Sequence, residues 1–231
     1  MLIAENIKIL EERIQKTCDR VGRKRGEVTL MGVSKFTPVE KMEEAFNAGI
    51  RCFGESRVQE AVEKLERWRS KDAQYHFIGS LQRNKAKQAA LIFDCIQSVD
   101  RNELIAELDK HTVARNARLN VLLELHTGEE TKNGFADTNE LFKAAELALN
   151  CKLLKPAGLM TMAPFTGDTE LIRMSFRQLV KAKAELEKRF PPVEGEYNWN
   201  CLSMGMSNDF EIAIEEGSTL LRVGSAIFKE D

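Results

Sequence analysis

The stretch Val28-Thr29-Leu30-Met31-Gly32-Val33-Ser34-Lys35 is an apolar run that ends in a single cation. Branched and large apolar side chains in so short a run predict a buried strand. Thr37 and Pro38 follow, and proline beside a hydroxyl residue is typical of a loop that leads into a helix. The stretch therefore predicts a strand that is followed closely by a helix, with Lys35 at the junction.

The same unit of strand and helix recurs along the chain. We predict strands at 28–34, 51–54, 75–79, 93–98, 119–126, 153–159, 199–203 and 219–223. Helical patterns lie between them at 38–48, 56–68, 82–91, 101–114, 138–150, 169–189 and 208–216. Before the first strand, Ile3, Ile7, Leu10 and Ile14 form one apolar stripe of a further helix.

This alternation favours a parallel sheet. Closing eight strands into a ring removes both sheet edges, which favours a barrel over an open, doubly wound sheet. We therefore expect an α/β fold, a single (β/α)₈ TIM barrel with an extra N-terminal helix. No linker rich in Pro, Gly or Ser divides the chain, so residues 1–231 are expected to form one domain.

Three of the helix starts carry the residues of a capping box, in which side chains satisfy the free N–H groups of the first turn. They are Thr37-Pro38-Val39-Glu40, Asp100-Arg101-Asn102-Glu103 and Asp137-Thr138-Asn139-Glu140. We expect side-chain caps at all three.

Composition excludes several classes of protein. A net charge of -2 gives no field that would favour nucleic acid or an anionic membrane. No apolar stretch approaches the length of a membrane span, and residues 1–7 lack the features of a secretory signal. The five cysteines are scattered without a Cys-x-x-Cys pair, which argues for reduced thiols and against a metal site. We expect a cytoplasmic protein.

Lys35 is the first candidate site residue. The carboxyl ends of parallel strands are where ligands bind in α/β folds, and a desolvated lysine amine is a common Schiff-base nucleophile. A solvated lysine that simply marks the end of the strand fits the same pattern.

The last two strands end in loops suited to an anion. Ser203 to Asp209 combines glycine and hydroxyl residues before a helix, and Arg222-Val223-Gly224-Ser225 adds a cation, a glycine and another hydroxyl. Loops after strands seven and eight commonly bind phosphate in this fold. Ordinary turns use the same residue types.

A phosphate site opposite an amine on the first strand suggests pyridoxal phosphate, with its aldehyde on Lys35 and its ring nitrogen facing Arg222. Arginine there would disfavour protonation of that nitrogen. His76, in the third strand, is a further candidate for the barrel mouth, although a hydrogen-bonded core histidine fits equally well.

Seven segments of the chain resemble the pyridoxal phosphate homeostasis protein family. The resemblance runs in order from about residue 28 to residue 228. Its segments are Val33 to Lys35, Phe53 to Glu60, His76 to Gln82, Asn84-Lys85, Gly158 to Met162, Leu202 to Asp209 and Arg222 to Phe228.

The resemblance implies a barrel like the N-terminal domain of alanine racemase, without that enzyme's second domain. It implies that Lys35 carries the cofactor, that Ser207, Gly224 and Ser225 hold its phosphate, and that Arg222 faces the ring nitrogen. We expect Ser203 and Met204, in the same motif, to contribute. Family members are regarded as non-catalytic proteins of vitamin B6 and amino-acid homeostasis, so the implied partners are the cofactor itself and apoenzymes that receive it. We expect a monomer.

The chain departs from the family pattern at Ser56, where asparagine is usual, so contact with the cofactor ring there is expected to be weaker or mediated by water. The alternative functions are a cofactor-dependent amino-acid racemase and a cofactor-free, aldolase-like enzyme that forms a Schiff base on Lys35. A two-base racemase needs a second proton carrier, typically tyrosine. Only Tyr75 and Tyr197 are present, and neither has an obvious base beside it in the sequence.

Overall fold

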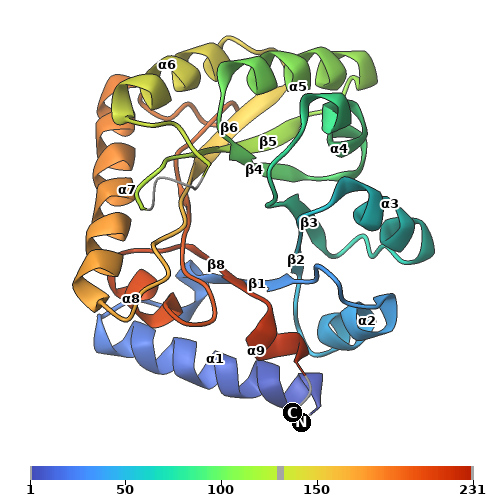
Figure 1. The fold of residues 1–231 in the computed structure, drawn as a ribbon, viewed down its shortest axis with the longest axis vertical. Coiled ribbons are helices and arrows are strands. Elements are labelled where there is room, and N and C mark those ends of the chain that lie inside the picture. Colours follow the sequence, from blue (N-terminus) through green and yellow to red (C-terminus); the bar gives the residue numbers. More distant parts are fainter. Residues whose placement is uncertain (1, 129–132, 230–231) are drawn as a thin grey trace.

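A computed structural model describes residues 2–128 and 133–229. In it, eight parallel strands close into a barrel in the order of the sequence (Figure 1). The strands are β1 (Thr29–Val33), β2 (Cys52–Glu55), β3 (Gln74–Phe77), β4 (Cys95–Val99), β5 (Leu119–Glu124), β6 (Leu154–Met160), β7 (Cys201–Ser203) and β8 (Leu220–Val223). The predicted TIM barrel is confirmed, and every predicted strand is present with its ends within two residues of those expected.

Helices surround the barrel on the outside (Figure 1). They are α1 (Ile3–Arg20), α2 (Val39–Asn47), α3 (Val58–Arg67), α4 (Ala86–Ile92), α5 (Asn102–Arg115), α6 (Thr138–Leu149), α7 (Thr169–Arg189), α8 (Phe210–Glu215) and α9 (Ser225–Phe228), with short 3₁₀ turns η1 (Arg25–Glu27) and η2 (Arg83–Lys85). None of the helices in the described part of the chain has the length and apolarity needed to cross a bilayer.

The extra N-terminal helix completes this outer ring. The helix that the structure describes after β8, α9, has four residues and is too short to cover the neighbouring strands. Helix α1 packs against α8, α9 and α2, and so takes the place between the last and first strands of the barrel. The Asn6 side-chain amide donates to the carbonyl of Ile227 at 3.1 Å, which ties α1 to α9.

The strands are buried on both faces, as parallel strands in this fold usually are. One face contributes to a large apolar layer beneath the helices, which includes Phe53 and Leu221. The other face fills the interior of the barrel with smaller clusters, one around Met31 and Cys52 and another around Cys95 and Leu122. All five cysteines are free thiols.

Only one of the three expected side-chain caps is present. The Asp137 carboxylate accepts from the backbone N–H groups of Asn139 and Glu140 at 2.8 and 2.9 Å. The predictions at Thr37 and Asp100 are wrong, since the residues that cap α2 and α5 are Pro38 and Arg101, without a side-chain hydrogen bond. Glu40 instead pairs with Arg67, and Asp100 with Arg101, so neighbouring cations compete for the carboxylates.

Candidate functional site

Lys35 lies just beyond the carboxyl end of β1, and its side chain is exposed at that mouth of the barrel. No hydrogen bond or ion pair of its amine is found among the residues that the structure describes. The next residue, Phe36, has a φ of 61°, in the left-handed region that residues with a Cβ rarely adopt. The chain therefore turns sharply at Lys35 and leaves the amine available.

Arg222 reaches the same end of the barrel from the neighbouring strand. Strands β1 and β8 pair in parallel, with Met31 beside Arg222 and Gly32 beside Val223. The Arg222 side chain is buried and donates from Nη1 to Ser203 Oγ and from Nη2 to the carbonyl of Thr161, both at 2.7 Å. A buried guanidinium with two fixed donors is a rigid, positively charged group in the barrel interior.

A chain of hydrogen bonds continues from Arg222 across the barrel. Ser203 Oγ donates to Gln97 Oε1 at 2.6 Å, and Gln97 Nε2 lies 2.7 Å from His76 Nδ1. With the Gln97 oxygen occupied by Ser203, its amide donates to Nδ1, which must then be unprotonated. Burial favours this state because it lowers the pKa of His76 to about 4. His76 is thus a hydrogen-bonded core residue, one of the two alternatives that the sequence left open.

The loops after β7 and β8 bring two hydroxyls together. Ser225 Oγ donates to Ser207 Oγ at 3.1 Å. A Cβ at Gly224 would lie 3.1 Å from the carbonyl oxygen of Val33, so the β8 loop packs directly against the end of β1. The candidate phosphate residues and Lys35 therefore lie on adjacent loops at one end of the barrel.

The two remaining predicted residues, Met204 and Ser56, follow β7 and β2 at the same end of the barrel. The Met204 side chain is fully buried in the apolar layer between the strands and the helices, so only its backbone borders the β7 loop. Ser56 is half-buried beneath the following loop, where a Cβ at Gly79 would lie 2.2 Å from the Ser56 carbonyl oxygen. This close packing restricts the space around Ser56.

The sequence places Gln97, Thr161 and Glu124 at strand ends but assigns them no role in this site. Gln97 and Glu124 stand near strand ends, which is a usable signal, but nothing in the sequence says that they face inward. Glu124 is buried at the end of β5, and burial, reinforced by the charge of Asp100, raises its pKa to about 7 against the opposing charge of Arg222.

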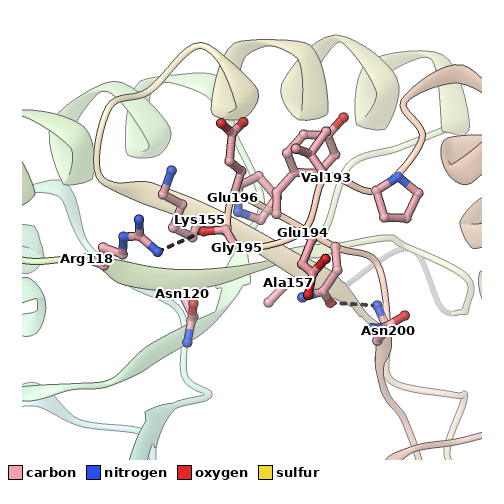
Figure 2. Close-up of a pocket in the computed structure, with 13 residues that line it drawn as sticks. Arg118, Asn120, Lys155, Ala157, Val193, Glu194, Gly195, Glu196 and Asn200 are labelled. Carbon is pink, nitrogen blue, oxygen red and sulfur yellow. Dashed lines mark hydrogen bonds between the residues drawn. The ribbon is translucent and has the colours of Figure 1, made fainter.

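Two cavities lie at the opposite end of the barrel, where the strands begin. One of about 510 Å³ is bordered by Arg118, Asn120, Lys155 and the loop 192–198, with Arg118 Nη1 donating to the carbonyl of Gly195 at 2.9 Å (Figure 2). These residues lie at the amino ends of β5, β6 and β7, away from Lys35. The described residues contain no group of His, Cys, Asp and Glu side chains placed to hold a metal ion.

Comparison with known proteins identifies close relatives. Residues 6–231 match the family model of the alanine racemase N-terminal domain. The pyridoxal phosphate homeostasis protein of Aquifex aeolicus is 41% identical, with 100% of this chain and 99% of the relative covered. The protein of the same name from Escherichia coli strain K12 is 35% identical, covering 98% and 95%.

This chain is also similar to solved structures. PipY of Synechococcus elongatus with pyridoxal phosphate bound superposes with a TM-score of 0.83 at 32% identity, covering 98% of this chain and 99% of PipY. Alanine racemase of Clostridium difficile is similar in fold alone, with a TM-score of 0.73 at 12% identity. That likeness covers 96% of this chain but only 56% of the racemase.

Proposed function

This chain belongs to the pyridoxal phosphate homeostasis protein family, and we propose that it binds pyridoxal phosphate through a Schiff base on Lys35. When bound, the cofactor supplies an aldehyde that combines with amines and a ring that withdraws electrons from them. The observation that carries the proposal is the convergence of Lys35, Arg222 and the Ser207–Ser225 hydroxyl pair on adjacent strands at one end of the barrel.

These residues suit the groups of the cofactor. Ser207 and Ser225 offer hydroxyl donors to a phosphate, and Gly224, which has no Cβ, lets the loop that carries Ser225 pack against the end of β1. Arg222 would face the ring nitrogen, and its positive charge would keep that nitrogen unprotonated.

Four further residues have supporting roles in this proposal. Ser203 would hold Arg222 directly, through its hydrogen bond to the guanidinium. His76 would support Ser203 through Gln97, and so would act at a distance from the cofactor. Met204 would contribute through its backbone and Ser56 through its hydroxyl.

We propose a role in intracellular vitamin B6 and amino-acid homeostasis, as a monomer that exchanges the cofactor with apoenzymes and has no turnover of its own. The positions of the two tyrosines support the absence of a second base. Tyr75 lies in the apolar layer outside the barrel, and its hydroxyl accepts from the Ser70 N–H at 2.9 Å. Tyr197 donates to the carbonyl of Pro191 at 2.7 Å and borders the cavity at the opposite end.

Absorption spectroscopy tests the binding proposal. Purified protein with added cofactor should give a visible Schiff-base band, and borohydride reduction followed by peptide mapping should place the cofactor on Lys35. Lys35→Ala should abolish both, whereas Lys87→Met, an exposed lysine on α4, should change neither. A wild-type protein that gains no band would overturn the proposal.

The racemase alternative makes a different prediction. Solvent-derived deuterium would appear at the α-carbon of an amino acid in a reaction that depends on Lys35 and approaches enzymatic rates. We expect exchange no faster than that caused by free cofactor.

A further inference from the structure

The backbone on both sides of Lys35 is held by one pair of side chains on α3. Lys64 Nζ donates to the carbonyl of Ser34 at 2.7 Å, and the N–H of Phe36 donates to Glu60 Oε1, also at 2.7 Å. Glu60 and Lys64 are themselves bonded, with Oε1 and Nζ 2.6 Å apart. They stand four residues apart, so they share a face of the helix. We call this pair the α3 clamp.

A buried carboxylate supports the clamp from beneath. Glu55 Oε1 accepts from Lys64 Nζ at 2.9 Å and from Ser34 Oγ at 2.7 Å. Burial raises the pKa of Glu55, against the hydrogen bonds and charge of Lys64. Burial also opposes ionisation of Glu60, but its hydrogen bonds from Lys64 and Phe36 outweigh this effect and lower its pKa. Two acids and one ammonium thus meet behind Lys35.

The conformation of Phe36 shows what the clamp achieves. Phe36 is 66% exposed, so burial in an apolar core does not explain the left-handed backbone. The guanidinium of Arg57, just before α3, lies over the ring at 4.8 Å, and Glu60 holds the N–H. Such a conformation persists where surrounding contacts impose it. Here those contacts come from α3.

We propose that Glu60 and Lys64 are positioning residues that aim the Lys35 amine into the barrel mouth. This inference rests on the proposed function, because it concerns how Lys35 meets an aldehyde. A displacement of about 1 Å at a reacting group costs up to roughly 100-fold in rate. Fixing the peptides before and after Lys35 removes the backbone motion that would cause one.

The same contacts keep the second amine unreactive. Lys64 Nζ has three acceptors, Ser34 O, Glu55 Oε1 and Glu60 Oε1, which match the three protons of an ammonium group. An ammonium engaged in this way has no lone pair with which to attack a carbonyl carbon. The clamp therefore favours Lys35 over Lys64 as the reactive amine, although Lys64 contacts the short segment to which Lys35 belongs.

The experiment measures how fast Lys35 reacts in three variants: Lys64→Met, Lys64→Arg and Glu60→Gln. After pyridoxal phosphate is added, we measure the rate at which the visible Schiff-base band appears. Borohydride reduction then identifies the lysine to which the cofactor is attached. We expect Lys64→Met to slow labelling of Lys35 by about 10- to 100-fold, Glu60→Gln to slow it less, and Lys64→Arg to recover part of the loss. Glu63→Gln, an exposed acid of the same helix, is the matched control and should react at the wild-type rate.

A second readout needs no cofactor. Competitive labelling with acetic anhydride across a pH series gives the reactivity of Lys35 relative to exposed lysines, and circular dichroism checks that each variant is folded. We expect an altered Lys35 pH profile in Lys64→Met. If that variant and Glu60→Gln fold and keep both the wild-type profile and trapping rate, the clamp has no positioning role. A wild-type protein that fails to bind the cofactor would contradict the proposed function instead, and the anhydride profiles would still test the clamp.

Discussion

Arg222 Nη1 lies 2.7 Å from Ser203 Oγ inside the barrel, where both side chains are buried. The Ser203 hydroxyl in turn donates a hydrogen bond to Gln97, and the Gln97 amide is hydrogen-bonded to His76. Four strands are therefore linked through one hydrogen-bonded chain that begins at a fixed positive charge. Buried networks of this kind hold their members in one arrangement when every member has a partner.

Arg222→Met should weaken cofactor binding by about tenfold or more, since hydrogen bonds to charged groups contribute roughly 1.5–3 kcal/mol. It should also leave the Thr161 carbonyl without its donor. Titration of the visible band measures affinity, and urea unfolding measures stability. Equal affinity and an identical spectrum in the variant would contradict the role given to Arg222.

His76 should make the protein less stable in acid. Its folded pKa of about 4 lies below the ordinary value of 6.5, so the unfolded chain binds more protons between these values. Stability is then lost as the pH falls from about 6.5 to 4, by up to about 3 kcal/mol. In His76→Gln this part of the pH dependence should vanish. Urea unfolding at pH 4.5 and 6.5 makes the comparison, and parallel profiles for the two proteins would rule the effect out.

Glu124 should have the opposite effect on the pH dependence of stability. Its folded pKa of about 7 exceeds the ordinary value of 4.5, so the folded protein binds more protons in this interval. Its contribution is full below about pH 4.5 and declines as the pH rises to about 7, by up to roughly 3 kcal/mol. Glu124→Gln should therefore gain stability relative to wild type between pH 5 and pH 8. A constant difference between the two proteins over that range would refute this.

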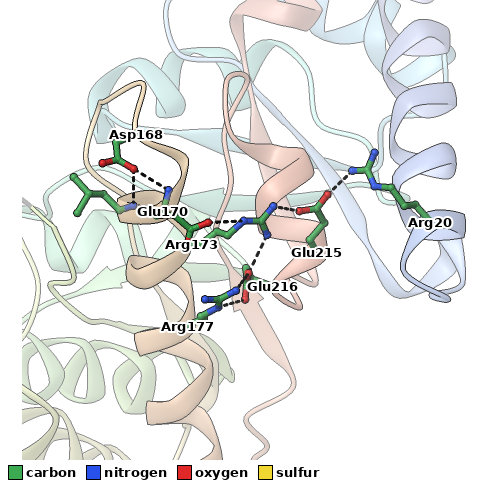
Figure 3. A network of polar contacts seen from close by, with 8 residues as sticks. Arg20, Asp168, Glu170, Arg173, Arg177, Glu215 and Glu216 are labelled. Atoms are coloured by element: carbon green, nitrogen blue, oxygen red, sulfur yellow. Dashed lines mark hydrogen bonds and ion pairs between the residues drawn. The ribbon is translucent and has the colours of Figure 1, made fainter.

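An ion-pair network ties three helices together on the outside of the barrel. Arg173, on α7, contacts both Glu215 and Glu216 at the end of α8, with 3.0 Å between its Nη1 and Glu216 Oε1 (Figure 3). Glu215 also pairs with Arg20 at the end of α1, and Glu216 with Arg177. The network therefore joins α7, α8 and α1 at one point.

Arg173→Ala should destabilise the protein by about 1 kcal/mol, because it breaks a shared, partly buried contact rather than a single surface pair. The loss should shrink in high salt. Arg67→Ala is the control, since the Arg67–Glu40 pair is well exposed and should contribute little. Thermal unfolding at low and high salt distinguishes the two variants, and equal losses would contradict the role of the network.

The barrel was predictable because strands and helices alternate along the whole chain. That Lys35, Arg222 and Ser225 meet at one end of the barrel was predictable because parallel strands place their carboxyl ends together. The hydrogen-bonded chain through Gln97 could not be predicted. Strands that are buried on both faces show no alternation of polar and apolar residues that would distinguish the inside of the barrel from the outside. For the same reason the sequence did not show that the Met204 side chain packs in the outer apolar layer. The Glu60–Lys64 spacing is visible in the sequence, yet it is shared by many exposed helical pairs and did not identify the clamp.

Helix α1 fills the gap beside β8, and this has a consequence for how the chain folds. The Asn6–Ile227 hydrogen bond joins residues 221 positions apart, and β1 has no partner on one edge until β8 is made. Contacts of such long range form slowly, and synthesis delivers α1 well before β8. During translation the apolar stripe of α1 and the open edge of β1 are left without their final partners. The step that closes the ring is thus also the step that ends the exposure of aggregation-prone surface on the nascent chain.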